Sequence, residues 1–378
     1  MRYCSECLLP DTRPNGALGP DGRCTACEFA SASESVDFEL RLDDLREVLR
    51  PYVSRSRTNR WDCIVGVSGG KDSTRQALWV REKLGLRPLL VCVAYPPRQV
   101  SLTGVRNLSN LTDLGFDIRV LAPAPEDSRL LMRASFLRFG NWAIPTEAAL
   151  FAGVPRMAIE TKIPLVLWGE NVALQVGDLG ALGKDIWDGN NLRNMNTLRG
   201  GAIGWMLDVV QDSRALSMYR FPSEEEIERA KVQTVFLGPA WSDWSMDMNS
   251  LYSLTHGLAF KDTGRELDDD PVGTAAVDED FVTVNQLVKY YKFGFARATE
   301  YVNLKIRAGE LRREDAIGVV ARHDGQCSDR LIASFCAYVG IRVPDFWETV
   351  RGFTNTDLFE LGDARPRPRF EVGIGVVR

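Results

Sequence analysis

The stretch Cys63-Ile64-Val65-Gly66-Val67-Ser68-Gly69-Gly70-Lys71-Asp72-Ser73 decides the fold of this chain. Its first five residues form an apolar run that is typical of a buried strand, and a helical pattern follows from Ser73. A strand, a glycine turn and a helix N-terminus in this order make an anion site, because backbone N–H groups point outward and the helix dipole is positive there. We interpret residues 68–73 as a cradle for a nucleotide pyrophosphate. The alternative is a plain glycine turn in which Ser73 only caps the helix.

The spacing of this loop differs from that of two common phosphate-binding motifs. It is neither the G-x4-G-K-[ST] of a Walker A loop nor the G-x-G-x2-G of a dinucleotide-binding turn. The loop instead resembles the S-G-G-x-D-S motif of the PP-loop ATPases, which split ATP between its α and β phosphates. The resemblance implies that four residues hold the pyrophosphate end of ATP: Ser68, Gly69, Gly70 and Ser73. It also implies that Lys71 adds positive charge and that Asp72 contacts Mg2+.

Length and composition limit the class of protein. A chain of 378 residues with 45% hydrophobic residues allows two or three domains and a large core. The net charge of −5 and the lack of a long basic block predict no nucleic-acid partner. No apolar run is long enough to cross a membrane, and the N-terminus lacks the apolar core of a signal peptide. We expect a cytoplasmic protein with reduced thiols and no membrane partner.

Four cysteines near the start have the spacing of a metal site. Cys4-x2-Cys7 and Cys24-x2-Cys27 form two knuckles, which is typical of a structural four-thiolate Zn2+ site. The segment between them is rich in turn residues and cannot bury much surface, so the metal would supply its folding energy. Two disulfides or an iron–sulfur cluster are the alternatives. The remaining cysteines have no ligand spacing: Cys63, Cys92, Cys327 and Cys336.

Apolar runs alternate with helical patterns over the first half of the chain. We predict strands at 62–67, 88–94, 117–122 and 164–168. We predict helices in the second half of 34–53 and at 73–85, 101–115, 126–138, 145–161, 285–306 and 313–322. This alternation indicates an α/β fold, a Rossmann-like parallel sheet with helices on both faces. Ligands of such sheets bind at the carboxyl ends of the strands, where Ala94, Gly169, Glu170 and Asn171 would join the glycine loop.

We divide the chain into four parts: a zinc module at 1–30, a helix and linker at 31–60, an ATP-binding domain at 61–260 and a mainly helical region at 261–378. Residues 172–260 are irregular and rich in glycine and tryptophan, and they are either loops over a site or a variable surface insertion. The acidic stretch 265–270 predicts a solvated turn, and the tail at 365–369 predicts an extended chain.

Four blocks, in order along the chain, carry a closer resemblance. They are Tyr3-Cys4-x2-Cys7 with Leu9-Pro10-Asp11-Thr12-Arg13-Pro14; Val67 to Ser73; Ile163-Pro164-Leu165-Val166-Leu167-Trp168-Gly169-Glu170; and Lys289-Tyr290-Tyr291-Lys292-Phe293-Gly294-Phe295-Ala296-Arg297-Ala298, which runs on into Asp315-Ala316-Ile317 and Asp324-Gly325-Gln326-Cys327. With these blocks the chain resembles the N-acetyl sugar amidotransferases of pseudaminic-acid, legionaminic-acid and O-antigen pathways. The resemblance implies ATP-dependent conversion of an acetamido group of a sugar or sugar nucleotide to an acetamidino group. Ammonia would come from a separate glutaminase and channel subunit.

Adenylation of an amide oxygen needs groups that bind ATP–Mg2+ and position the amide. We assign Glu170, with its two neighbours, to the α-phosphate or Mg2+. Lys292 and Arg297 would bind phosphates or substrate, the alternative being two ordinary surface cations. Asp11 and Arg13 would support the substrate side.

One stretch departs from the family. Where relatives have Trp-Pro-Cys-His, this chain has Ile144-Pro145-Thr146-Glu147. Glu147 is either a replacement base or a first-turn helix carboxylate. Glutamine hydrolysis by this chain is not expected, because Cys4 belongs to the metal site and the two histidines, His256 and His323, stand alone. The rival functions are sulfur transfer by a PP-loop enzyme and a metal-stabilised binding module that does no chemistry.

Overall fold

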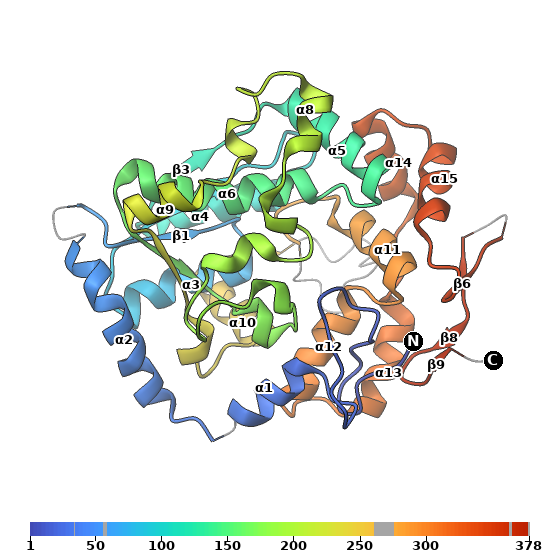
Figure 1. Cartoon of the computed structure of the whole chain (residues 1–378), viewed down its shortest axis with the longest axis horizontal. Helices are drawn as coiled ribbons and strands as arrows, with labels where there is room; N and C mark the ends of the chain where they lie inside the picture. Colours follow the sequence, from blue (N-terminus) through green and yellow to red (C-terminus); the bar gives the residue numbers. More distant parts are fainter. Residues whose placement is uncertain (34, 56–58, 261–275, 363–364, 377–378) are drawn as a thin grey trace.

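A parallel sheet forms the centre of the first half of the molecule. The computed structural model describes residues 1–33, 35–55, 59–260, 276–362 and 365–376 (Figure 1). Five parallel strands lie in the order β3-β2-β1-β4-β5. Their bounds are β1 Cys63–Gly66, β2 Pro88–Val93, β3 Asp117–Leu121, β4 Leu165–Trp168 and β5 Gln233–Phe236. The predicted α/β class is therefore confirmed.

Helices cover both faces of this sheet because successive strand residues point to opposite sides. Cys63 and Val65 of β1 pack in one cluster with α2 (Phe38–Arg55) and α3 (Lys71–Glu82). Ile64, between them, packs on the other face against α6 (Ile144–Thr161). The near-continuous apolar strands of the sequence are explained by this burial on two sides.

The strand order places a ligand crevice beside β1. From β1 the chain moves outward through β2 and β3, then returns to place β4 on the other side of β1. The connections that leave β1 and β4 diverge at the carboxyl edge, and this switch point is where open α/β sheets bind ligands. The glycine loop follows β1 and Gly169-Glu170 follows β4, so both predicted segments meet at this crevice.

Two predictions of secondary structure were wrong. The fifth strand, β5, was not predicted, because its short apolar run lies within the stretch 172–260 that we interpreted as irregular. The single helix predicted at 285–306 is two helices, α11 (Val282–Phe293) and α12 (Arg297–Arg307). Gly294 ends α11 in the left-handed conformation, with φ 76°, which favours a residue without Cβ.

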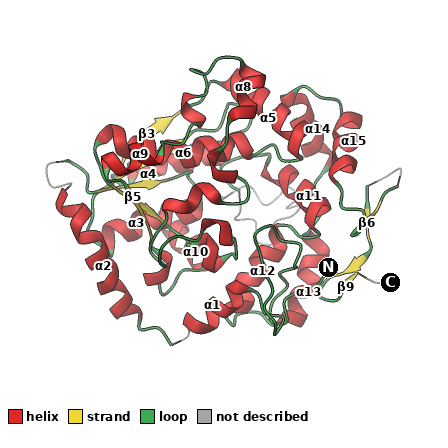
Figure 2. Ribbon diagram, viewed as in Figure 1, coloured by secondary structure: helices red, strands yellow, loops and turns green. Residues whose placement is uncertain are grey.

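The C-terminal part is helical, as predicted, and it shares its core with a helix of the sheet region (Figure 2). Met132 and Phe136 of α5 (Pro125–Phe139) pack in one cluster with α11, α14 (Asp329–Val339) and α15 (Val343–Phe353). The extended tail contains two short antiparallel pairs, β6 (Phe359–Glu360) with β7 (Arg367–Pro368) and β8 (Phe370–Glu371) with β9 (Gly375–Val376). The four-part division remains a prediction, and the predicted turn at 265–270 lies outside the described residues.

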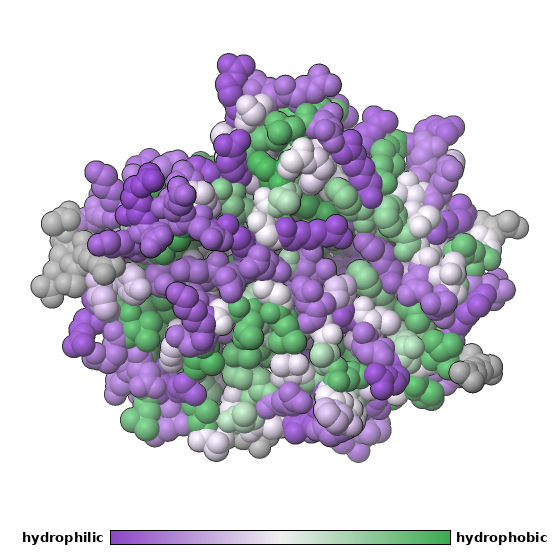
Figure 3. Space-filling view, viewed as in Figure 1, coloured by the Kyte–Doolittle hydropathy of each residue, from purple (hydrophilic) through white to green (hydrophobic). Residues whose placement is uncertain are grey.

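The remaining helices complete the layers. They are α1 (Thr25–Ser33), α4 (Leu102–Asp113), α7 (Val172–Gln175), α8 (Gly204–Val210), α9 (Glu224–Ala230), α10 (Met246–Thr255) and α13 (Arg313–His323), with short 3-10 turns at Leu179–Ala181, Asn190–Asn194, Arg199–Gly201, Ser217–Tyr219 and Gly238–Ala240. Three hydrophobic residues of α10 are exposed, Met248, Leu251 and Leu254. Figure 3 shows hydrophobic patches among hydrophilic side chains on the visible face of the molecule. Among the described helices, none is both long and apolar enough to cross a membrane.

The N-terminal module is docked on the C-terminal helices. Leu8 is fully buried in a cluster with Val302 of α12 and Ala316 of α13, and its backbone N–H donates to Asn303 Oδ1 at 2.7 Å. Burying one such leucine stabilises the fold by about 1.5–3 kcal/mol. A change in the module is therefore felt by α12 and α13.

Candidate active site

The glycine loop has the geometry of an anion cradle. Gly69 has φ 87°, and a Cβ there would lie 3.1 Å from the Gly104 carbonyl oxygen, so conformation and space both require glycine. Gly70 is the N-cap of α3 and supplies no side chain, which leaves the first-turn N–H groups uncovered. Ser73 Oγ accepts from Ser68 N at 3.3 Å and donates to the Gly70 carbonyl at 3.2 Å. The two hydroxyls that we predicted to bind phosphate thus also shape the loop.

Lys71 and Asp72 form an ion pair beside the loop. Lys71 Nζ lies 2.6 Å from Asp72 Oδ2, and the Lys71 side chain is 5% exposed whereas that of Asp72 is 40% exposed. Asn249 of α10 donates to Asp72 Oδ1 at 2.8 Å. Ser253 of α10 donates to the Lys71 carbonyl at 2.8 Å. Helix α10 therefore fixes the first turn of α3 and the direction of both charged groups.

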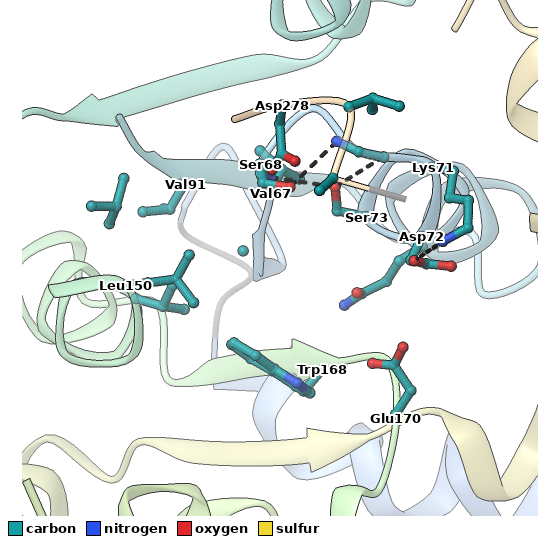
Figure 4. Close-up of a pocket in the computed structure, with 17 residues that line it drawn as sticks. Val67, Ser68, Lys71, Asp72, Ser73, Val91, Leu150, Trp168, Glu170 and Asp278 are labelled. Atoms are coloured by element: carbon teal, nitrogen blue, oxygen red, sulfur yellow. Dashed lines mark hydrogen bonds and ion pairs between the residues drawn. The ribbon is translucent and has the colours of Figure 1, made fainter. Parts of the chain in front are cut away.

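Glu170 faces this pair across a cavity of about 240 Å3 (Figure 4). The cavity is also lined by Ser68, Gly70, Lys71, Asp72 and Ser73. Burial, and then the nearby Asp72 charge, raises the pKa of Glu170 from 4.5 to about 7. The two carboxylates, on facing walls, have oxygen ligands that can take up Mg2+. The ammonium of Lys71 lies beside them.

Four residues predicted to bind cofactor do not line this cavity in the part of the chain that the structure describes: Gly69, Ala94, Gly169 and Asn171. Gly69 acts through the loop conformation. Asn171 is buried, caps α7 by accepting from Ala173 N at 3.2 Å and donates to the Ile186 carbonyl at 3.0 Å. Ala94 continues β2 with an N–H bond to the Leu121 carbonyl at 2.8 Å. Their assignment to the cofactor stays a prediction.

Sequence reasoning missed several lining residues that come from distant segments. Leu150 and Val154 of α6, Trp168 of β4 and Asp278 enclose the cavity (Figure 4). Asp278 and Ser68 line the same cavity, although 210 positions separate them in the sequence (278 minus 68). Trp168 immediately precedes Gly169 and is the one of these that a strand-end argument would have found.

We expect Glu170→Gln to change how stability depends on pH. The folded carboxyl has a raised pKa, so between about pH 4.5 and 7 the folded state holds a proton that the unfolded state has lost. The contribution of Glu170 to stability is therefore greatest below pH 4.5 and falls as the pH rises to 7. Thermal unfolding without nucleotide measures the effect. The melting temperature of the variant minus that of the parent should rise across this window, because only the parent loses stability there, and should then level off.

Glu160→Gln is the matched control, because Glu160 is an exposed carboxylate near the end of α6. Its difference from the parent should stay flat across the same window. A flat difference for Glu170→Gln as well would contradict the raised pKa.

A second cavity of about 250 Å3 opens at the N-terminus of α6. Ile144 and Glu147 line it, whereas Leu150 and Val154 of the same helix line the first cavity. Glu147 and Leu150 are three residues apart, which is roughly 5 Å along a helix. The two cavities are thus neighbours along α6.

The wall opposite α6 carries a network of charges. Arg13 donates to Glu300 Oε1 at 2.8 Å, and Lys289 Nζ lies 2.9 Å from the same oxygen. Burial raises the pKa of Glu300, but these two cations outweigh burial and lower this pKa to about 2. Burial raises the pKa of Glu147 and lowers that of Lys289. Arg13 therefore lines the second cavity, and its support of the substrate side stays a prediction.

The other residues predicted to bind or support substrate lie in different parts of the structure. Lys292 lines the second cavity, whereas Arg297 begins α12 and is not among the described residues that line it. Asp11 pairs with Arg2 at 3.1 Å on the surface, away from this wall. Arg199, which no sequence pattern singled out, does line the cavity.

The four predicted metal ligands converge. The Sγ atoms of Cys4, Cys7, Cys24 and Cys27 are buried and all lie within 4.8 Å of one another. The Cys4–Cys27 and Cys7–Cys24 Sγ distances are 3.8 and 3.7 Å. A tetrahedron with Zn–S bonds of about 2.3 Å has S–S edges of about 3.8 Å, whereas a disulfide needs about 2.05 Å. The donor set and spacing therefore suit Zn2+.

Neighbouring groups offset the charge of the thiolates. Leu9 N and Cys24 N donate to sulfur at 3.4 and 3.2 Å. Arg307 of α12 places a guanidinium nitrogen 3.7 Å from Cys7 Sγ, and donates to the Gln175 carbonyl at 3.0 Å. Such supporting contacts hold the ligands in place and tie the module to the rest of the fold.

Comparison with known proteins agrees with the resemblance drawn from the sequence. Residues 276–369 match the family model described as LPS biosynthesis protein WbpG-like, C-terminal domain. This region contributes Asp278 to the first cavity and Lys289, Lys292 and Glu300 to the second. A search of curated proteins gives no match.

Among solved structures, the chain is similar to NMN synthetase from Francisella tularensis. The sequence identity is 18%, the aligned region covers 56% of this chain and 81% of that chain, and the TM-score is 0.26. The fold assignment rests on the strand order and the glycine loop.

Proposed function

We propose that this protein is an ATP-dependent amidotransferase that converts the acetamido group of an N-acetylated sugar, free or nucleotide-linked, into an acetamidino group. One observation carries the proposal: the Ser-Gly-Gly-Lys-Asp-Ser loop and Glu170 line one cavity, and a charged second cavity adjoins it along α6. One cavity suits ATP and the other suits an acceptor. The LPS-biosynthesis family match supports a sugar acceptor of the O-antigen type.

The reaction needs activation because an amide oxygen is a poor leaving group. The amide oxygen would attack the α-phosphorus of ATP, forming an O–P bond as the bond to pyrophosphate breaks. Ammonia would then add to the amide carbon, lose its protons to solvent, and expel AMP with the former amide oxygen. The product is the amidine, and AMP and pyrophosphate are released.

The residues of the first cavity suit the adenylation step. The loop N–H groups and Lys71 would bind pyrophosphate and stabilise its charge as the bond breaks. Asp72 and Glu170 would hold Mg2+, which neutralises phosphate charge when bound. Trp168 and Leu150 give an apolar wall for the nucleoside.

Ammonia from a separate glutaminase and channel subunit is part of this proposal. The described cavities contain no cysteine, and the four N-terminal cysteines converge on a metal site. His256 is held by Tyr252, whose carbonyl oxygen lies 2.8 Å from His256 Nδ1. Nothing in these contacts suits glutamine hydrolysis.

Sulfur transfer is the second candidate, and cysteine burial counts against it. Cys63 and Cys92 are buried in strands, and burial raises the pKa of the Cys92 thiol to about 12. Burial raises the pKa of Cys63 further still. Such thiols are inert at neutral pH, whereas a persulfide carrier needs a reactive thiolate near ATP.

The test is to incubate the purified protein with ATP, Mg2+, excess ammonium and a panel of N-acetylated sugars and sugar nucleotides. We expect ammonium-dependent AMP, and a product lighter than the acceptor by the difference between O and NH. Mass spectrometry of the product identifies the acceptor. AMP formed only with a sulfur donor, or bound ATP with no AMP for any acceptor, would reject the proposal.

A further inference from the structure

In the part of the chain that the structure describes, the second cavity contains two cations without a carboxylate partner. Its three carboxylates are engaged by other residues of the same cavity. Glu300 binds Arg13 and Lys289, Asp178 accepts from Asn196 N at 3.1 Å, and Glu147 bonds to Thr197. The remaining charged residues of the wall are Lys292 and Arg199, and no ion pair links either to a described carboxylate.

Lys292 and Arg199 converge on one residue, Phe139, at the C-terminus of α5. Lys292 Nζ donates to the Phe139 carbonyl at 2.9 Å, and the guanidinium carbon of Arg199 lies 6.0 Å from the centre of the Phe139 ring. Lys292 is half-buried and Arg199 is exposed at the mouth. Burial and then the Arg199 charge lower the pKa of Lys292, so the two cations repel each other.

Arg199 is also held in an uncommon conformation. Its φ is 47°, in the left-handed region, and two glycines with positive φ follow it. A non-glycine residue there costs roughly 1 kcal/mol, and such outliers cluster where a ligand is bound. The turn Arg199–Gly201 thereby places a second positive charge over the cavity that Lys292 enters.

We propose that Lys292 and Arg199 form the binding site for the anionic group of the acceptor, a phosphoryl or carboxylate group attached to the N-acetylated sugar. An anion between two cations relieves their repulsion and accepts charge-assisted hydrogen bonds from both. Along the path of a bound acceptor, Phe139 would lie at the anionic end, Glu147 in the middle and Leu150 at the first cavity. An acceptor anchored at Phe139 thus extends along α6 toward the loop. This orientation rests on the proposed function, whereas the anion site itself does not.

The test measures binding by calorimetry with the ATP site filled by a non-hydrolysable ATP analogue and Mg2+. The probes are N-acetylglucosamine, N-acetylglucosamine 1-phosphate and N-acetylneuraminic acid. We expect at least one anionic probe to bind about tenfold or more tightly than the neutral sugar, which is the size of one charge-assisted hydrogen bond. The preferred probe distinguishes a phosphoryl from a carboxylate source. Equal binding of all three probes, or no binding of either anion, overturns the proposal.

Variants separate charge from packing. Lys292→Gln keeps a donor for the Phe139 carbonyl and loses the charge, Lys292→Arg keeps the charge, and Arg199→Gln alters an exposed side chain. Both glutamine variants should lose about tenfold in affinity for the anionic probe and none for the neutral sugar, and Lys292→Arg should keep most of it. Arg214→Gln, at an arginine 90% exposed and paired with Asp212, is the control and should bind like the parent. Undiminished binding by Arg199→Gln and Lys292→Gln refutes this site.

The two proposals fail in different ways. Anion binding that depends on both cations, with no AMP formed, leaves the anion site standing and removes the amidotransferase assignment. Amidine formation with unchanged anion affinity in both glutamine variants leaves the amidotransferase assignment standing and removes the anion site.

Discussion

Replacing Lys71 with methionine is expected to lower kcat/KM for AMP formation by about 100- to 1,000-fold, the loss typical of removing one group that stabilises charge in a transition state. Lys71 is the cation on α3 that faces the first cavity, and its ammonium is already oriented by Asp72 at 2.6 Å. Negative charge develops on the leaving pyrophosphate as the bond between the α and β phosphates of ATP breaks, so Lys71 is expected to act most strongly in this transition state. Steady-state kinetics with varied ATP and acceptor measure the loss.

The fold should tolerate this change. Methionine is similar in length to lysine, Lys71 is 5% exposed, and Asp72 retains its bond from Asn249 and its own exposure of 40%. The substitution therefore leaves no buried uncompensated charge, which is what makes the loss of one partner of an ion pair costly. Melting temperatures should agree within about 4 °C, a difference of about 1 kcal/mol.

Lys83→Met is the matched control for Lys71→Met. Lys83 follows the last turn of α3, is half exposed, and lies 3.8 Å from Glu39 on the surface. Its AMP formation should equal that of the parent. A Lys71→Met enzyme with full activity would show that the loop does not handle pyrophosphate as proposed.

Loss of the metal is expected to have the largest effect on stability. We predict about one Zn2+ per chain and no iron by elemental analysis, because four thiolates in a closed set are typical of structural zinc. Cys24→Ser should release zinc and lower the melting temperature by on the order of 10 °C. The reason is that unfolding the module uncovers Leu8 and the faces of α12 and α13 that it covers.

Cys336→Ser provides the control, because Cys336 lies in the core of the C-terminal helices, remote in sequence from the four ligands. This variant should retain its zinc whatever its stability. Iron with visible absorption, or a Cys24→Ser protein with the parent's melting temperature, would contradict a structural zinc site.

The local features of this protein could be predicted from its sequence. The glycine loop is a property of eleven consecutive residues, because an apolar strand, a left-handed glycine and an N-terminal helix turn need no distant partner. The same holds for the Cys-x2-Cys knuckles, where each pair of ligands is set by one tight turn. Four of the five strands followed from apolar runs, and burial on both faces explains the runs of β1, β2 and β4.

The sequence did not give features that arise from packing. β5 is an edge strand that pairs with β4, and α11 separates from α12 at Gly294 although the periodicity continues. Glycine is the usual residue just after a helix C-terminus, so Gly294 was the local signal for the end of α11.

The sequence by itself thus determined the α/β fold class, the glycine loop and the four-cysteine cluster, because each depends on residues close together in the chain. Only the tertiary structure decided which residues complete the two cavities. Asp278 reaches the loop, and Arg199 meets Lys292 at Phe139, across separations that no periodicity spans. The physical reason is that helices and strands form from local backbone preferences, whereas a cavity forms where side chains from several packed elements leave space between them.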